Sequence, residues 1–437
     1  MRAWLLVAML VATGCTAPAA NEGCIHVVDE NGEKSDKCLP VAASAKRVDT
    51  GTPTFSKPTE ITNPLHPTAK LTQTLYGGQV DGKPFRTEVT LLPGTKTIEW
   101  QGQKIEARIS QYAAFSDGRI AEVALDWYAQ ADDGSVWYLG EDVFNYDNGA
   151  VADTGGTWIA GPDAPAAMIM PASPRVGDVY RPENAPEVVF EEVTVTAVGR
   201  TVDGPSGPVK GAITVRELHM DGSREDKTFA PGYGEYSTGT PSGDLEQAML
   251  ALPTDARPGP VPSELDTFAS VIARARDAVA AGDWTAATTA GRAVLRAWSE
   301  FQPSDAPLEL LRTQLGRDID ALNDAIGARS ATAARGAALR VGQGELDLRS
   351  RYQPVPATDL ARMKLWARQL VVDAAAGDKG GVAGDAECLK WTYDRIGHTA
   401  DVDAALAKVR DAAAKGDLAA ASAAATELLK LLGQRRR

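Results

Sequence analysis

The sequence predicts a protein of two domains, an N-terminal antiparallel all-β domain (a sandwich or an open barrel) followed by an all-α bundle of helical hairpins. The first half alternates apolar and polar residues in short segments separated by Gly, Asp and Pro, as antiparallel strands do. After a Pro/Gly-rich link, the second half changes to Ala, Leu, Arg and Asp at helical spacing. Apolar residues make up 44% and charged residues 24% of the chain, which is typical of globular proteins.

The first 14 residues have the pattern of an export signal. Arg2 precedes an apolar run from Ala3 to Ala12, and the small residues Thr13 and Gly14 follow. The run is far shorter than the ~20 residues that a membrane-spanning helix needs, so we expect a cleaved signal peptide.

The signal ends in Ala-Thr-Gly-Cys, which resembles the lipobox of bacterial lipoproteins. The resemblance implies that Cys15 carries palmitate-type acyl chains, becomes the new N-terminus and anchors the protein to a membrane. The remaining chain would then work in the cell envelope, outside the cytoplasm. The lack of Asp after Cys15 resembles the outer-membrane sorting pattern of organisms with two membranes. The alternative is an ordinary secretory signal that is cut at Ala17 or Ala20.

Three more cysteines follow Cys15 in the sequence. In an oxidising envelope we expect a disulfide bond between Cys24 and Cys38, which closes a small hairpin-like loop and stabilises it by ~3 kcal/mol. Cys388 lies in a helical pattern beside Leu389 and Trp391, which favours a buried small hydrophobe over a nucleophile.

The β domain is expected over residues 67–245, after a Pro/Thr-rich tether that completes the segment 15–66. Strands are predicted, for example, over 85–91, 104–110, 187–196 and 212–218. Tight reversals are predicted at Asp117-Gly118, Asp133-Gly134, Asn148-Gly149 and Asp221-Gly222.

A linker is predicted over 246–262 and a helical domain over 263–437, which contains an internal repeat. Residues 276–298 align without a gap on 410–432, and each copy predicts a helix, a Gly C-cap, an Asp N-cap and a second helix. With weaker echoes at Asp324 and Asp373, we expect about eight helices in four hairpins, as a bundle or a short solenoid. The pattern resembles tetratricopeptide-type hairpins without their full consensus, which implies a protein or peptide partner.

The densest group of aromatic and acidic residues lies in a predicted hairpin over 126–147. Its D-W-Y-A-Q and V-W-Y-x-G-E segments, with later M-P and A-P-G segments, resemble an uncharacterised β-rich domain of bacterial envelope proteins. That resemblance covers roughly residues 61–237 and implies a fold, with no assigned functional residues.

Two interpretations of this hairpin remain open. Its aromatic rings stack across strands and fill the core, or some of them form a ligand face on which sugar rings stack. The candidate ligand face comprises Trp127, Tyr128, Trp137, Tyr138, Asp126 and Glu141. Alternation places Trp127 and Tyr128 on opposite faces of a sheet, so at most half of these residues can share one face. A glycosidase pair among Asp126, Glu141 and Asp142 is a further alternative, because two carboxylates are what that reaction needs.

Other functions are disfavoured by what the sequence lacks. The net charge is −13 and no basic stretch is long, so we expect no nucleic-acid partner. The histidines His26, His66, His219 and His398 are far apart, so no metal or other cofactor is predicted. No catalytic serine, P-loop or dinucleotide motif occurs, and we single out no catalytic residue. The leading hypothesis is a non-enzymatic binding or scaffolding role in which the helical domain engages a protein partner. An envelope glycan bound by the β domain is the alternative.

Overall fold

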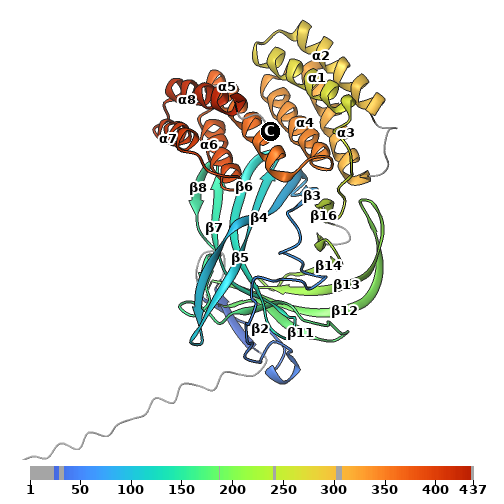
Figure 1. Ribbon diagram of the computed structural model, residues 1–437, viewed down its shortest axis with the longest axis vertical. Coiled ribbons are helices and arrows are strands. Elements are labelled where there is room, and N and C mark those ends of the chain that lie inside the picture. Colours follow the sequence, from blue (N-terminus) through green and yellow to red (C-terminus); the bar gives the residue numbers. More distant parts are fainter. Residues whose placement is uncertain (1–23, 29–33, 187, 240–242, 302–307, 435–437) are drawn as a thin grey trace, which may run out of the picture.

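The computed structural model describes residues 24–28, 34–186, 188–239, 243–301 and 308–434. In these residues it confirms the predicted fold class, because a large antiparallel sheet built between Gln73 and Leu252 precedes the helices (Figure 1). The signal peptide and Cys15 lie outside the described residues. In the described part of the chain, no helix combines the length and the apolar character that crossing a membrane requires.

The β domain consists of a small hairpin and a 14-stranded antiparallel sheet, as far as the structure describes it. The strands are β1 (Cys24–Val28), β2 (Lys34–Pro40), β3 (Gln73–Val80), β4 (Lys83–Trp100), β5 (Gln103–Ser116), β6 (Arg119–Gln130), β7 (Val136–Asp147), β8 (Ala150–Asp153), β9 (Trp158–Ile159), β10 (Ala167–Met170), β11 (Val179–Ala185), β12 (Val189–Gly204), β13 (Gly207–His219), β14 (Arg224–Ala230), β15 (Gly234–Gly239) and β16 (Leu245–Leu252).

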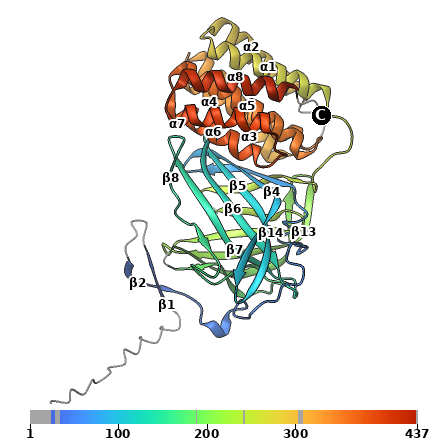
Figure 2. The same ribbon diagram turned by 60° about the vertical axis from the view of Figure 1, so that its left-hand side comes forward.

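The sheet order is β10-β7-β6-β5-β4-β3-β16-β15-β14-β13-β12-β11, with β8 and β9 paired to β7. The sheet curves strongly, so that β4–β7 form one wall and β11–β14 face them from the other side (Figures 1 and 2). The two ends of the sheet approach each other where β10 contacts β11. The predicted reversals are present, since Asp117 and Gly118 between β5 and β6 both have positive φ (50° and 79°), as a tight hairpin turn needs.

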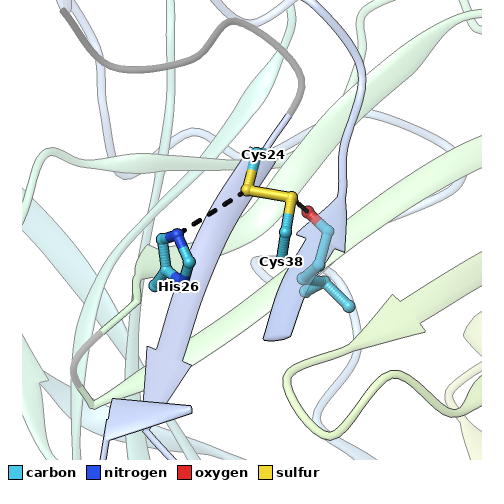
Figure 3. The surroundings of a disulfide bond; sticks show 4 residues. Cys24, His26 and Cys38 are labelled. Atoms are coloured by element: carbon cyan, nitrogen blue, oxygen red, sulfur yellow. Dashed lines mark hydrogen bonds between the residues drawn. A yellow bond between two sulfur atoms is a disulfide. The ribbon is translucent and has the colours of Figure 1, made fainter. Parts of the chain in front are cut away.

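The predicted disulfide bond between Cys24 and Cys38 is confirmed. It joins β1 to β2, with Cα atoms 5.4 Å apart, and the His26 ring lies beside it with Nε2 3.9 Å from the Cys24 sulfur (Figure 3). Leu39 of β2 packs against Phe190 and Leu218, which attaches the hairpin to the large sheet. The third cysteine, Cys388, is buried, and its pKa is raised well above the ordinary thiol value by burial, as a packed side chain requires.

The segment before the large sheet differs from the predicted tether, because it packs on the β domain. Ile61 is fully buried, and Thr62 and Asn63 donate their backbone N–H groups to the Gln130 side chain at 2.7 and 2.9 Å. The Asn63 amide also donates to the carbonyl of Pro171 at 3.1 Å. Proline and threonine composition predicts an extended backbone, but it does not reveal these side-chain contacts to distant strands.

The end of the β domain also differs from prediction. β16 continues to Leu252, inside the segment 246–262 that the sequence predicts as a linker. The strand lies between β3 and β15, and its residues from Ala248 to Leu252 are buried. A short apolar run such as AMLAL is compatible with a strand or a helix, so periodicity alone does not reveal the strand.

The helical domain contains eight helices among the described residues, in the four hairpins that the sequence predicts. They are α1 (Ser263–Ala280), α2 (Trp284–Phe301), α3 (Glu309–Gly327), α4 (Ala331–Ser350), α5 (Val355–Ala376), α6 (Lys379–Tyr393), α7 (Ala400–Ala414) and α8 (Leu418–Gln434). α1–α4 contact one another in a closed cycle, and α5–α8 do the same. The domain is therefore two four-helix bundles that meet at α4 and α5, rather than an open superhelix (Figure 1).

The repeated Gly-Asp pairs form the reversals of the first and last hairpins. Gly282 and Gly416 have φ of +68° and +66°, the left-handed conformation that ends a helix. Asp283 and Asp417 then accept backbone hydrogen bonds at 2.9 and 3.0 Å from residues three positions on, as N-caps do.

A buried ion-pair network attaches the helices to the sheet. Arg362 on α5 pairs with Asp359 at 2.8 Å and also contacts Glu88 of β4 at 3.2 Å. Arg86 and Arg395 join the same carboxylate. Burial raises the pKa of Glu88, but the neighbouring arginines outweigh it and hold that pKa below its usual range. The network therefore consists of charged groups of β4, of α5 and of the segment after α6 that neutralise one another.

Candidate functional site

The six residues of the predicted ligand face do not share one open face. Trp127 and Trp137 are 2% and 3% exposed, so neither ring is available to a ligand from outside. The Nζ atom of Lys96 lies 3.1 Å from the centre of the Trp127 ring, and the Trp137 indole donates to the Ser135 hydroxyl at 2.8 Å. The two tryptophans therefore pack in the core, which is the first of the two interpretations of this hairpin.

The remaining four residues lie together inside the curved sheet. Tyr128 and Tyr138 stack with ring centres 4.8 Å apart, and the Tyr138 hydroxyl donates to Asp126 at 2.9 Å. Asp126 and Glu141 oppose each other in the register of β6 and β7, and both are 8% exposed. Burial first, and then the charge of Glu141, raise the pKa of Asp126 well above its ordinary value. The pKa of Glu141 is raised to about 7, chiefly by burial.

A cavity of about 170 Å³ opens beside these residues, within the concave side of the sheet. Alternate residues of four adjacent strands line it: Thr74 and Tyr76, Val89 and Leu91, Ser110 and Tyr112, and Asp126 and Tyr128. The opposite wall comes from β14, β15 and β16, and His66 lies over Tyr128 with ring centres 4.7 Å apart. Alternation in the strands is the sequence signal for this wall, but the strands that complete it are distant in sequence.

A second hollow, of about 490 Å³, lies in the helical domain, in the groove between the two bundles. Its floor is apolar and comes from α1, α4 and α5, with Ile272, Leu346, Leu360 and Leu365 as its larger side chains. We refer to this hollow as the interbundle groove. The sequence predicts a partner-binding helical domain but does not locate this groove.

Four cations and one carboxylate line the interbundle groove. Arg349 pairs with Glu345 at 2.8 Å, and Arg276 lies 3.6 Å from Asp277. Lys364 and Arg368, four residues apart on α5, form no ion pair with any described residue; Lys364 is half-buried and Arg368 is exposed. Burial, and then the charge of Arg368, lower the pKa of Lys364. Their spacing along one helix face is the signal that the sequence offers for this feature.

A third group joins Glu191, Glu217 and His219 near the other edge of the sheet, where ligand atoms lie within 4.8 Å of one another. His219 contacts Glu191 at 3.3 Å, and the Nζ atom of Lys227 lies 2.6 Å from Glu217. Hydrogen bonds to Glu191 and Glu225 raise the pKa of His219 to about 10, so its imidazole is a cation at neutral pH. A protonated imidazole cannot ligate a metal, and two internal cations already compensate these carboxylates, so we assign no metal to this group.

Comparisons with known proteins identify no relative: no family model matches the sequence, and no curated protein or solved structure matches it significantly.

Proposed function

We propose that the protein is a lipid-anchored, non-enzymatic binding protein of the bacterial cell envelope. Its helical domain would hold an acidic, amphipathic segment of a protein partner in the interbundle groove. The observation that carries this proposal is an apolar floor in the same groove as two cations, Lys364 and Arg368, that form no ion pair with any described residue.

The shape of the groove supports a peptide ligand. An amphipathic helix binds by placing its apolar side chains between two helices, as Ile272, Leu346 and Leu365 would allow here. A volume of about 490 Å³ lies within the ~300–1,000 Å³ that is usual for binding pockets.

The charges of the groove support an acidic sequence in the partner. Glu345 and Asp266 already compensate Arg349, whereas Lys364 and Arg368 have no carboxylate of their own among the described residues. Carboxylates on the polar face of a bound helix would complete these two pairs and would speed association at low salt.

The position of the N-terminal hairpin supports an anchor at the opposite end of the molecule. β1 and β2 lie at the end of the β domain that is distant from the helices (Figures 1 and 2). Cys15 precedes Cys24 by a few residues, so acylation there would hold this end at the membrane and present the interbundle groove to the surroundings.

The groove is tested with a fluorescein-labelled peptide that carries Leu on one helical face and Glu on the other. We expect the double variant Lys364→Glu/Arg368→Glu to weaken its binding at least about tenfold, measured by fluorescence anisotropy. The matched control is Arg292→Glu/Arg296→Glu, which reverses two exposed cations at the same spacing on α2. Equal affinities for wild type, double variant and control would contradict the proposal.

The anchor is tested by metabolic labelling with palmitate and by membrane fractionation. Cys15→Ser should abolish the label and release the protein from the membrane, while the buried Cys388→Ser should change neither. A wild-type protein that takes up no label would contradict lipid anchoring without bearing on the groove.

A further inference from the structure

The cavity inside the β domain is a separate binding site that the proposed groove does not use. Five aromatic residues line it, namely Tyr76, Tyr112, Tyr128, Phe229 and Tyr233. Its volume of about 170 Å³ compares with the ~150 Å³ cavity that holds one benzene molecule, so it fits a ligand of fewer than about ten heavy atoms.

Three carboxylates line the same cavity without a cation beside them on its wall. They are Asp126 of β6, Glu235 of β15 and Glu246 of β16. None of the described residues that line the cavity is Lys or Arg. Lys227 is close to one end, but its Nζ atom lies 2.6 Å from Glu217 and 4.0 Å from Glu235, so Glu217 binds it more closely.

The only basic side chain among the described lining residues is neutral. Burial lowers the pKa of His66 to about 4, and its Nδ1 atom lies 2.9 Å from the Thr68 hydroxyl. Burial also raises the pKa of Asp126 well above its ordinary value and that of Glu246 to about 7. These carboxyl groups therefore lack the positive charge that would favour their ionised forms.

Aromatic faces and carboxylates attract the same kind of ligand. The face of an aromatic ring is negative and stabilises a cation, above all where water is excluded. A carboxylate adds the full charge that a ring lacks. A bound cation would supply the missing positive charge and favour the ionised forms of Asp126 and Glu246, whereas a neutral sugar would leave these carboxyl groups protonated. We propose that this cavity binds a small organic ammonium ion.

The test uses isothermal titration of the purified full chain with choline and with 3,3-dimethyl-1-butanol, its uncharged analogue of the same shape. We expect choline to bind at least about tenfold more tightly than the alcohol, because only choline carries a charge. Glucose should not bind. No heat from choline up to about 10 mM, or equal binding of the alcohol or of glucose, would overturn the proposal.

Variants locate the binding site. Asp126→Asn and Glu246→Gln keep the side-chain shape and should each weaken choline binding about tenfold, because an amide cannot ionise beside the bound cation. The control is Glu106→Gln, which removes an exposed carboxylate from β5. If either isosteric variant does not unfold with the wild-type melting curve, two variants of Tyr112 are measured in its place. Tyr112→Leu removes the aromatic ring and should weaken choline binding. Tyr112→Phe keeps the ring and should not weaken it. Choline affinity unchanged in the folded variants would overturn the assignment.

Discussion

Arg86 of β4 donates from Nε to the Asp347 carboxylate of α4 at 2.7 Å, across 261 residues of sequence. Asp347 also accepts from Arg362 of α5 at 3.0 Å, so a single carboxylate joins the sheet to both helical bundles. Both Arg86 and Asp347 are buried, and a buried charge is stable only in a fixed arrangement of partners. This contact therefore determines how the helices sit on the sheet, and with it the direction in which the interbundle groove faces.

Removal of this carboxylate should destabilise the protein severely. We expect Asp347→Ala to lower the free energy of unfolding by about 3–5 kcal/mol, because it removes a carboxylate that two buried arginines share and leaves only Glu88 and Asp359 to compensate them. Asp226→Ala is the control, since it removes an exposed pair with Arg216 and should cost less than about 1 kcal/mol. Both are measured by urea unfolding. A loss for Asp347→Ala as small as the control would show that the network does not hold the domains together.

The N-caps of the two repeated hairpins should contribute equally to the free energy of unfolding. Asp283→Ala and Asp417→Ala should each lower the free energy of unfolding, measured by thermal unfolding, by about 1 kcal/mol. Each substitution removes the acceptor for a helix N–H group that has no partner within the helix. Asp320→Ala, at an exposed position inside α3, is the control and should have little effect. A cap variant as stable as this control would contradict the assigned role.

These hairpins illustrate what the sequence could predict. The order helix, Gly, Asp, helix is local information, and it located the reversals at Gly282 and Gly416. The Asp117-Gly118 turn and the Cys24–Cys38 disulfide are local in the same sense. Such features depend on residues that are close together in sequence. Their conformational preferences do not depend on where the rest of the chain lies.

The sites are less predictable because they join residues that are distant in sequence. Asp126 and Tyr128 belong to the aromatic and acidic group that the sequence identifies. Glu246, which completes their cavity, lies on β16, in a segment that the sequence predicts as linker. The groove likewise requires α1 and α5 to be neighbours across a bundle interface. Composition does not predict which distant strands or helices become neighbours. Those neighbours determine which aromatic residues are buried in the core and which line the cavity.

The Glu246 carboxyl group should make stability depend on pH. Burial raises its pKa from 4.5 to about 7; the charges of Glu235 and Glu225 also raise the pKa, while the Thr87 hydrogen bond and the charge of Lys227 lower it. The folded state then binds a proton more tightly than the unfolded chain, so this contribution to stability is complete below pH 4.5 and is lost as the pH rises through 7.

Substitution of this residue should remove that dependence. Glu246→Gln should be more stable than wild type by about 3 kcal/mol at pH 8 and should differ little at pH 4.5, measured by thermal unfolding. The exposed Glu106→Gln should show no such difference between the two pH values. A constant offset between wild type and Glu246→Gln at both pH values would contradict the raised pKa.

The central proposal is that the interbundle groove binds an acidic segment of a partner. It is tested most directly by reversing the charge of the groove and, separately, the charge of the peptide. Anisotropy titrations compare two peptides that share a Leu face and carry either Glu or Lys on the other face. Wild type and Arg292→Glu/Arg296→Glu should prefer the Glu peptide, and Lys364→Glu/Arg368→Glu should prefer the Lys peptide. Such an inversion can arise neither from misfolding nor from nonspecific adhesion. If the groove variant keeps the wild-type preference, or wild type binds both peptides equally, the groove does not recognise acidic segments.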